Sequence, residues 1–399
     1  MSLKIASLFS GCGGLDLGFT GGFVSNGRKY EKLDTKIVFA NDFEQDIVAC
    51  YNSNPLLTGD GADCLMQDIR TVEDEKIPDY DILLAGFPCQ PFSNAGNRKG
   101  VNDDNGRGTL FEECERIIKA KIATGKRPKA FVFENVRGIL SSKMPDGVTT
   151  VPQEILQRMQ KIGYNVAMQL VCASDYGVPQ QRYRVLIIGI DDNLKLGSFD
   201  FDYLKKVVEE YNLPSKSFSH DEELLLGTIL QGAREIEGDI VWDYSKTTQN
   251  TVELIGGCEH GNDAFKYFKK GFKKSELPPI VFEGRSWKNI PYEKLSPRLK
   301  KIADDPKRYH APKFFRRFAF GEINGTITAS AQPENCGITH PVENRRYSVR
   351  ECARIQSFPD DFIFSTIPVQ SQYKVIGNAV PPVLGWVIAK ALLNFLNGK

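Results

Sequence analysis

Short apolar runs alternate with helix-like segments along the first 190 residues of the chain. The runs are rich in β-branched, aliphatic and aromatic residues and are bounded by turn residues, a combination typical of strands. Because the apolar positions are continuous and do not alternate with polar ones, we expect strands buried on both faces of a sheet. The runs are KIASLFS (4–10), TKIVFAND (35–42), YDILLAG (80–86), KAFVFENV (129–136), NVAMQLV (165–171) and RVLIIGI (184–190).

Apolar residues at helical spacing separate these runs, at 44–52, 110–122 and 151–162. Strands and helices that alternate in this way predict βαβ units and a mostly parallel, doubly wound α/β sheet. After residue 190 the rhythm stops, and it returns only with the helix-like RECARIQSF (350–358) and an apolar helix at 381–395. The simplest organisation is one α/β domain that is interrupted by a second domain and closed by the C-terminal helix.

Composition narrows the class of protein. The 399 residues contain nine cysteines without C-x-x-C spacing and four histidines without i, i+4 spacing, so we expect neither a disulfide framework nor a metal site. The chain shows no apolar run of roughly 18 residues and no signal-peptide pattern. We therefore expect a protein that does not cross a membrane and stays in the reducing cytoplasm.

Charge is distributed unevenly. The net charge is +1, yet residues 264–320 hold 16 Lys and Arg against 5 Asp and Glu. A concentrated basic segment with aromatic residues between the cations is typical of a polyanion site. A solvated, lysine-rich face is the alternative, and charge alone favours neither.

A glycine-rich turn follows the first expected strand, in SLFSGCGGLDLGF (7–19). Such a turn is typical of nucleotide sites in α/β sheets, but its spacing is not the dinucleotide fingerprint and no P-loop lysine follows. At the end of the second strand Asp42 can bind ribose hydroxyls and Phe43 can stack on a base, while Asp68 and Ile69 are placed to meet the adenine edge. An adenosine ligand without a phosphate chain indicates S-adenosyl-L-methionine. The alternative for Asp42 is a cap on the following helix.

Cys89 follows the third apolar run, in LLAGFPCQPFSNAG (83–96). Free cysteine is among the most buried residue types, so a thiol packed in the core is one interpretation. The surrounding loop of small, turn-forming residues indicates instead a thiol that solvent can reach, and its thiolate would be a nucleophile.

Six blocks together carry a resemblance to a known family. They are SLFSGCGGLDLGF, AGFPCQPFS, FVFENV, DYGVPQQRYRV, RECARIQSFPD and YKVIGNAVPP. With these blocks, in family order, the chain resembles the DNA (cytosine-5)-methyltransferases of bacterial restriction-modification systems. The resemblance implies a Rossmann-like, S-adenosylmethionine-dependent methyltransferase domain at 1–191. It places an inserted, smaller target-recognition domain at 192–335 and a C-terminal segment that returns to the first domain at 336–399.

The resemblance also implies cofactor and partners. S-adenosyl-L-methionine is the expected cofactor, S-adenosyl-L-homocysteine the product, and no metal takes part. Double-stranded DNA is the expected partner of a monomeric enzyme, and a cognate restriction endonuclease acts separately.

Residue roles follow from the same resemblance. Cys89 adds to carbon 6 of cytosine, which makes carbon 5 nucleophilic, and Glu134 contacts N3 and the exocyclic amine. Arg182 and Arg184 hold the base and favour the Cys89 thiolate, although an exposed ion pair would otherwise explain two such arginines. The cofactor residues are Phe9, Gly11, Gly13, Gly14, Leu15, Asp42, Phe43, Asp68, Ile69, Pro88, Leu110, Asn378 and Ala379. The substrate residues are Gln90, Ser93, Asn135, Val136, Arg98 and Lys99.

Carbon 6 of a stacked cytosine is out of reach, so the base is expected to flip out of the duplex. Residues 90–108, rich in Gly, Asn and Asp, are expected to close over the DNA as a mobile loop, and Ala95 stands where family members place an intruding side chain. Two alternatives stay open, a tRNA cytosine-5 methyltransferase with the same motifs and a DNA-binding regulator without catalysis. The long basic domain favours DNA, and the presence of Cys89 and Glu134 favours an enzyme.

Overall fold

The computed structural model describes residues 2–88, 110–237, 240–258, 267–268, 272–305 and 314–398. Its centre is a seven-stranded sheet with the order β5-β4-β1-β6-β7-β10-β8. These strands are β1 (Leu3–Leu8), β4 (Thr35–Asp42), β5 (Cys64–Met66), β6 (Ile82–Ala85), β7 (Ala130–Val136), β8 (Tyr164–Cys172) and β10 (Tyr183–Asp191). The strands from β5 to β7 are parallel, and β10 is antiparallel to both neighbours. All six predicted strands are present, and the mostly parallel α/β sheet is confirmed.

The antiparallel direction of β10 follows from the short chain between β8 and β10. Only the 3-10 helix η6 (Ala173–Asp175) and the strand β9 (Gln180–Gln181) lie between them. A parallel pair would need a crossover of about a dozen residues or more, usually a helix. The chain therefore turns back, and β10 enters the sheet between β8 and β7.

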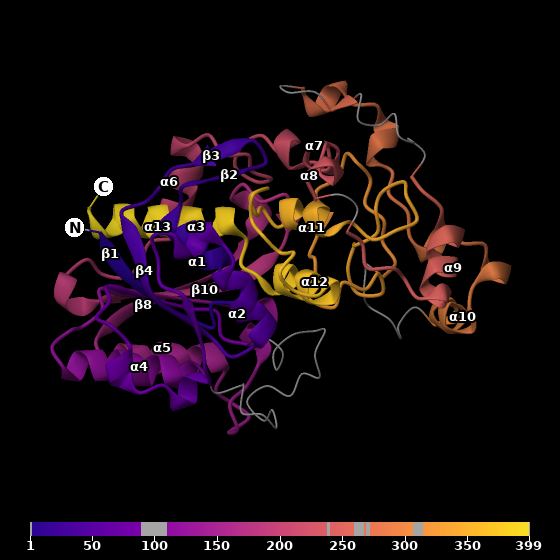
Figure 1. Ribbon diagram of the computed structural model, residues 1–399. Helices are drawn as coiled ribbons and strands as arrows, with labels where there is room; N and C mark the ends of the chain where they lie inside the picture. The colour runs from indigo at the N-terminus through magenta and orange to yellow at the C-terminus, as the bar shows by residue number, and fades with distance from the viewer. Residues whose placement is uncertain are drawn as a thin grey trace.

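Side chains of the central strands point alternately into two cores. In β1, Ile5 belongs to one core, whereas Ala6 and Leu8 belong to the other. The helices α1 (Gly14–Thr20), α6 (Asp202–Glu210) and α13 (Pro382–Leu396) cover the first face, and α4 (Phe111–Ala123) and α5 (Val151–Lys161) cover the second (Figure 1). The continuous apolar runs of the sequence are thus strands covered on both faces, as predicted.

The predicted helices are present, and the ends of four of them differ from the predicted ends by at most one residue. The expected helix at 44–52 is α2 (Gln45–Asn52), and those at 110–122, 151–162 and 381–395 are α4, α5 and α13. The RECARIQSF segment forms α11 (Val349–Ile355), which starts with a capping box between Ser348 and Glu351. The other elements before the second lobe are β2 (Phe23–Ser25), β3 (Arg28–Tyr30), α3 (Pro55–Thr58), η1 (Ile69–Thr71), η2 (Asp74–Lys76) and η5 (Arg137–Ser141), and α12 (Val369–Asn378) precedes α13.

α1 and α13 cross in close contact because each has a glycine at the crossing. A Cβ atom on Gly18 would lie 2.5 Å from the carbonyl carbon of Gly385, closer than any real side chain allows. The segment Val369–Leu396 has the length and composition of a membrane span, but 78% of its most apolar window is buried inside the protein. Its apolar character is explained by this packing in the core.

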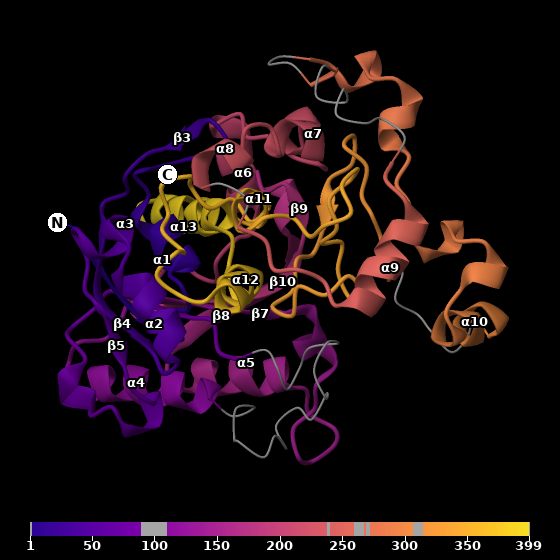
Figure 2. The ribbon, with the colours of Figure 1, turned by 45° about the vertical axis from the view of Figure 1, so that its right-hand side comes forward.

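The chain between the sheet and α11 forms a second lobe beside the carboxyl ends of the parallel strands (Figures 1 and 2). η7 (Asp192–Leu194) and α6 lead from β10 toward this lobe. Its elements are η8 (Glu222–Leu224), α7 (Leu226–Ile229), α8 (Arg234–Glu237), α9 (Lys246–Ile255), η10 (Lys274–Glu276), η11 (Pro279–Phe282), η12 (Trp287–Asn289), η13 (Tyr292–Lys294), α10 (Pro297–Asp304) and β11 (Asn324–Gly325). Residues of α9, α10 and the segments between them, with Phe314 and Phe315, form a small core of their own. α6 instead shares the core of α13, so the position at which a separate domain begins stays a prediction.

Candidate active site

The glycine-rich turn joins β1 to α1 in a backbone conformation that favours glycine. Gly11 and Gly13 have φ angles of 59° and 84°, and Phe9 shares this left-handed conformation at 54°. A Cβ atom on Gly14 would lie 2.2 Å from the Val380 carbonyl oxygen, so the turn is pressed against the C-terminal segment. A Cβ atom on Gly11 would meet nothing within 4 Å. The backbone of the turn at Gly11 is therefore open toward the space beside it that contains no protein atoms.

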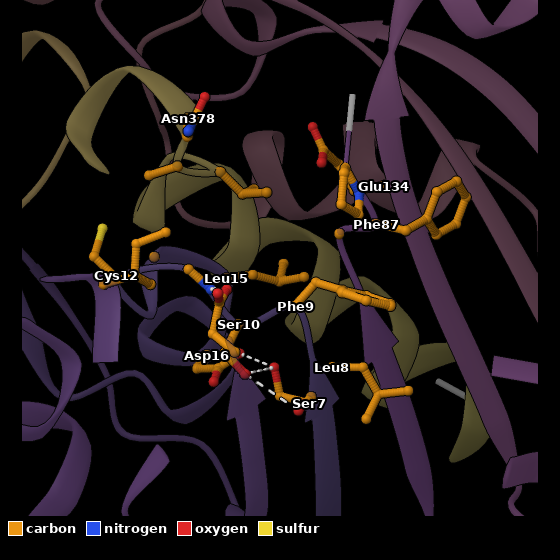
Figure 3. A pocket seen from close by; sticks show the side chains of 18 of the residues that line it. Ser7, Leu8, Phe9, Ser10, Cys12, Leu15, Asp16, Phe87, Glu134 and Asn378 are labelled. Atoms are coloured by element: carbon orange, nitrogen blue, oxygen red, sulfur yellow. Dashed lines mark hydrogen bonds between the residues drawn. The ribbon is translucent and has the colours of Figure 1, made fainter. Parts of the chain in front are cut away.

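That space is a pocket at the carboxyl ends of the parallel strands (Figure 3). Four predicted cofactor residues of the turn line it, namely Phe9, Gly11, Gly14 and Leu15. Asp42 and Phe43 line it from the end of β4, Pro88 from the end of β6, and Asn378 and Ala379 from the end of α12. The structure thus brings together residues that lie more than three hundred positions apart in the sequence.

Asp42 ties the glycine turn to the end of β4. Its Oδ2 accepts a hydrogen bond from the Gly11 N–H (3.1 Å), and its Oδ1 accepts one from the Phe43 N–H (2.8 Å). Burial raises the pKa of this carboxyl, and the backbone donors lower it in part. The helix that follows has Glu44 as its N-cap and no side-chain cap, so capping α2 does not explain Asp42. The Phe43 ring beside it is 57% exposed, which leaves its face open for stacking.

An ion pair forms the other end of the pocket. Glu134 in β7 and Arg184 in β10 are nearly buried, and Arg184 Nε lies 2.6 Å from Glu134 Oε1. Arg184 Nη1 also donates to the Tyr183 carbonyl (2.7 Å), which holds the guanidinium in place. A Cβ atom on Gly86 would lie 3.6 Å from Glu134 Oε2 and 3.9 Å from the Phe9 carbonyl oxygen. Gly86 therefore stands between the carboxylate and the glycine turn, where the two ends of the pocket meet.

The end of β6 is anchored beside this ion pair. The Asn135 side chain donates to the Phe87 carbonyl (3.3 Å), and Val136 lines the pocket with Pro88. Cys89 is the next residue in the sequence, and it lies outside the residues that the structure describes. The same holds for Gln90, Ser93, Arg98 and Lys99 and for the predicted closing loop 90–108 with Ala95.

The eight cysteines within the described ranges are all buried and free. Burial raises the pKa of the Cys50 thiol to about 12 and that of Cys12, which lines the pocket, well above its usual range. A thiol needs to ionise before it can act as a nucleophile. Cys12 and Cys50 are therefore poor nucleophiles, and the nucleophilic role of Cys89 stays a prediction.

Arg182 occupies a different environment from Arg184. It is 1% exposed, and its guanidinium donates to the carbonyls of Ile327 (3.0 Å), Gly377 (3.0 Å) and Ala379 (3.0 Å). Within one strand, residues two positions apart point to the same face. Arg182 lies in the turn between β9 and β10, so this rule does not apply to it and Arg184. Arg184 contacts Glu134. Arg182 instead links the chain that returns from the second lobe, at Ile327, to the pocket wall at Ala379.

Four predicted cofactor residues do not line the pocket. The Asp68 carboxylate binds the Arg70 guanidinium (2.5 Å) and caps η1, and Ile69 and Leu110 pack in the core under α4. Gly13 faces Leu57 and Tyr51, which a Cβ atom would approach to 2.4 Å and 2.9 Å.

The prediction also missed pocket residues, above all Ser7, Ser10, Asp16 and Gly86. An acidic residue in the apolar first turn of the helix, as in GGLDLGF, is a signal that points to Asp16.

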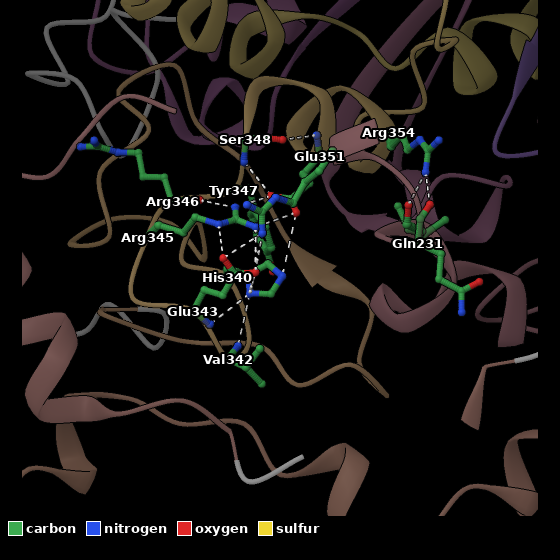
Figure 4. A network of polar contacts seen from close by, with 12 residues as sticks. Gln231, His340, Val342, Glu343, Arg345, Arg346, Tyr347, Ser348, Glu351 and Arg354 are labelled. Atoms are coloured by element: carbon green, nitrogen blue, oxygen red, sulfur yellow. Dashed lines mark hydrogen bonds and ion pairs between the residues drawn. The ribbon is translucent and has the colours of Figure 1, made fainter. Parts of the chain in front are cut away.

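A second polar cluster fastens the chain where it returns from the second lobe to α11 (Figure 4). Arg345 forms ion pairs with Glu343 (2.8 Å) and Glu351 (2.7 Å). His340 accepts a hydrogen bond from the Glu343 N–H (3.1 Å), and burial lowers its pKa to about 4, so it is neutral at pH 7. The charged side chains of this cluster are paired with one another, which indicates that the cluster has a structural role.

The fold is an α/β sheet whose pocket joins a glycine turn and Asp42 at one end to a buried Glu134–Arg184 pair at the other. The family model for C-5 cytosine-specific DNA methylases matches residues 3–394, and the chain belongs to this family. Members of the family use S-adenosyl-L-methionine as methyl donor, and the chain is a DNA (cytosine-5)-methyltransferase.

Relatives match over nearly the whole chain. Type II methyltransferase M.FnuDI of Fusobacterium nucleatum is 30% identical, over 100% of this chain and 96% of its own. Type II methyltransferase M.NgoFVII of Neisseria gonorrhoeae is 32% identical, over 98% of this chain and 86% of its own.

Two solved structures show the same fold. A putative DNA modification methyltransferase encoded within an E. coli prophage has a TM-score of 0.59 at 22% identity, over 99% of this chain and 100% of its own. The S. pombe Dnmt2 methyltransferase has a TM-score of 0.53 at 17% identity, over 98% of each chain.

Proposed function

We propose that this chain is the modification methyltransferase of a type II restriction-modification system and methylates carbon 5 of one cytosine in a specific duplex DNA sequence. One observation carries the site assignment: a single pocket runs from the glycine turn and Asp42 to the Glu134–Arg184 pair. A cofactor at the first end and a flipped base at the second would meet at Gly86. The full-length similarity to type II methyltransferases supports the biological role.

The cofactor end fits S-adenosyl-L-methionine. The exposed backbone at Gly11 leaves room for close approach, Asp42 offers a buried acceptor for ribose hydroxyls, and the open Phe43 ring offers a stacking surface. When bound, this cofactor supplies an activated methyl group. Asn378 and Ala379 form the opposite wall, and the chemistry proposed here uses no metal.

The base end supplies the groups that activate cytosine. The Cys89 thiolate adds to carbon 6, and the electron pair that moves into the ring makes carbon 5 nucleophilic. Glu134 holds N3 and the exocyclic amine of the base, while Arg184 fixes the carboxyl in the orientation this contact needs. After carbon 5 has gained the methyl group it loses its proton, and the C6–S bond breaks to release Cys89.

DNA is proposed to lie between the two lobes, with residues 192–335 reading its sequence. Asn135 and Val136 flank the Glu134 carboxyl, and Gln90, Ser93, Arg98 and Lys99 are proposed contacts of the closing loop with the substrate. Cations of the second lobe would bind phosphates, so DNA binding should weaken steeply with salt. We propose a monomer that acts in the cytoplasm, with a separate endonuclease cleaving the unmodified sequence.

Bisulfite sequencing of host DNA that carries the gene tests the function directly. Protection of one cytosine within a short recurring sequence is expected, and it also yields the recognition sequence. Methyl incorporation into tRNA but not into duplex DNA would contradict the proposal.

The nucleophile is tested separately. Cys89→Ala should abolish methylation and keep duplex binding, and a duplex with 5-fluorocytosine at the target should trap an adduct on Cys89. A variant with wild-type activity, or an adduct on another cysteine, would refute the covalent role.

A further inference from the structure

Asp16, in the first turn of α1, is a buried acidic group in the pocket wall that the proposed chemistry does not use. It is 0% exposed, and both of its carboxylate oxygens accept hydrogen bonds, of which Figure 3 shows the one from Ser7. Oδ1 accepts from Ser7 Oγ (2.7 Å) and Oδ2 accepts from Tyr51 Oη (2.9 Å), while Ser10 Oγ donates in turn to Ser7 Oγ (2.9 Å). These donors are neutral hydroxyls, and no Lys, Arg or His within the described ranges pairs with Asp16.

A buried carboxylate without a cation is unfavourable. Burial raises the pKa of Asp16 to about 6, and the hydrogen bonds from Ser7 and Tyr51 lower it only in part. Asp16 is therefore mostly ionised at pH 7 although its surroundings disfavour the charge. An asparagine has the same shape and can bond to both hydroxyls, so hydrogen bonding and packing do not require an ionisable side chain here.

The charge of the pocket differs between its two ends. Asp16 and Asp42 both line the cofactor end, and both carboxyls are buried among neutral donors. Arg184 is the cation of the described pocket wall, and it is bound to Glu134 at the other end. The cofactor end is thus negative. S-adenosyl-L-methionine has a positively charged sulfonium, whereas S-adenosyl-L-homocysteine has a neutral thioether at the same place.

We propose that Asp16 is a specificity-determining residue whose carboxylate makes the pocket prefer the positively charged cofactor over the neutral product. This inference rests on the proposed function. Both carboxylate oxygens are occupied by Ser7 and Tyr51, so the charge acts through the weakly screening interior of the pocket wall and not by direct contact. The preference lets the product leave and a new cofactor take its place after each methyl transfer.

Calorimetric titration of Asp16→Asn with each ligand at pH 7 tests the inference without measuring activity. The cofactor should bind about tenfold more weakly, while the product binds within about twofold of the wild type, because only one ligand has the extra charge. Asp16→Asn should also raise Tm at pH 8, since it removes an unfavourable buried charge. A residue that only holds the turn in shape would lower Tm and weaken both ligands equally, and either result overturns the inference.

A matched control is Asp191→Asn. Asp191 is 6% exposed and caps η7 at the opposite edge of the sheet. This variant should leave the affinity ratio of the two ligands unchanged. An equal loss of preference in both variants would overturn a specific role for Asp16.

A measurement on the unaltered protein keeps the test independent of how the variant folds. The titratable groups that interact with Asp16 are Tyr51, Cys12 and Cys64, and burial raises the pKa of all three, so they stay protonated below pH 8. Asp42, whose pKa is also raised by burial, and Glu44 line the same end of the pocket. Between pH 7 and pH 5 the preference of the wild type for the cofactor should fall as Asp16 gains its proton, and it should fall less in Asp16→Asn. A flat ratio overturns the inference. Failure of the proposed function is distinguishable, because the protein would then bind neither ligand.

Discussion

The two ends of the active-site pocket hold acidic residues in opposite electrostatic settings. At the base end, Glu134 faces the Arg184 guanidinium at 2.6 Å, so its charge is compensated by a partner in the protein. At the cofactor end, Asp16 has only the hydroxyls of Ser7 and Tyr51. In the proposed function, the protein therefore supplies a cation at the end that holds the neutral base, and it supplies none at the end where the cofactor is itself positively charged.

Glu134→Gln should produce the largest effect, because it removes the carboxylate that is proposed to hold the base and that Arg184 binds. We expect methyl transfer to fall by a factor of about a hundred to ten thousand, the range for a positioned acid–base group. Single-turnover kinetics with a saturating duplex measures this, and cofactor affinity should stay within about twofold of the wild type. Glu115→Gln, at the buried Glu115–Arg158 pair between α4 and α5, is the matched control and should keep the wild-type rate.

The pH dependence of stability should show the uncompensated charge of Asp16. Its pKa is about 6 in the folded chain and 3.8 in the reference state, so folding takes up a proton between these values. Protonated Asp16 therefore contributes to the free energy of unfolding below pH 3.8, and this contribution is lost as pH rises through 6. The loss is about 3 kcal/mol for this fully buried group. Urea unfolding at several pH values measures this slope. If the free energy of unfolding of Asp16→Asn depends on pH as steeply as that of the wild type, the charge of Asp16 does not cause the dependence.

Arg182→Met should separate the two arginines of the PQQRYR motif. The change leaves the carbonyls of Ile327, Gly377 and Ala379 without their donor, and each buried acceptor that loses its partner costs about 1–3 kcal/mol. Arg184→Lys should instead keep most of the stability, because a cation still faces the nearly buried Glu134, and it should lose activity, because the guanidinium no longer fixes the carboxyl. Denaturant unfolding and methyl transfer measured on both variants check the contrast, and the opposite order of effects would contradict it.

Gly86→Ala should give the smallest effect. The added methyl group would lie in ordinary contact with Glu134 and the Phe9 carbonyl, at 3.6 Å and 3.9 Å, so stability should hardly change. The passage between the two ends of the pocket becomes narrower, and we expect methyl transfer to slow about tenfold, about 1.4 kcal/mol in the barrier. A binding titration should give wild-type cofactor affinity, and weaker binding would place Gly86 elsewhere in the site.

Much of the catalytic core was predictable because its signals are local. Continuous apolar runs predicted the six strands, and glycines at a strand end predicted the left-handed turn that lines the pocket. Asp42 at the end of β4 and Glu134 and Val136 of the FENV block also line the pocket, as expected. These signals can be seen in the sequence because a buried strand requires apolar residues at its own positions and a left-handed turn favours glycine at its own positions.

Long-range contacts were not predictable from the same patterns. Nothing near Arg182 in the sequence shows that its guanidinium binds carbonyls at Ile327 and Gly377, which lie 145 and 195 positions away. Partners of this kind depend on how distant segments pack.

The sequence by itself determined the class of fold, the family and the candidate nucleophile, because the strand pattern and the six blocks are local features with ordered spacing. Only the tertiary structure decided which charges face one another. It placed Arg184 on Glu134, removed Arg182 from the pocket, and buried Asp16 in the wall without a cation. The physical reason is that electrostatic energy depends on distance and burial, and both are set when the chain folds.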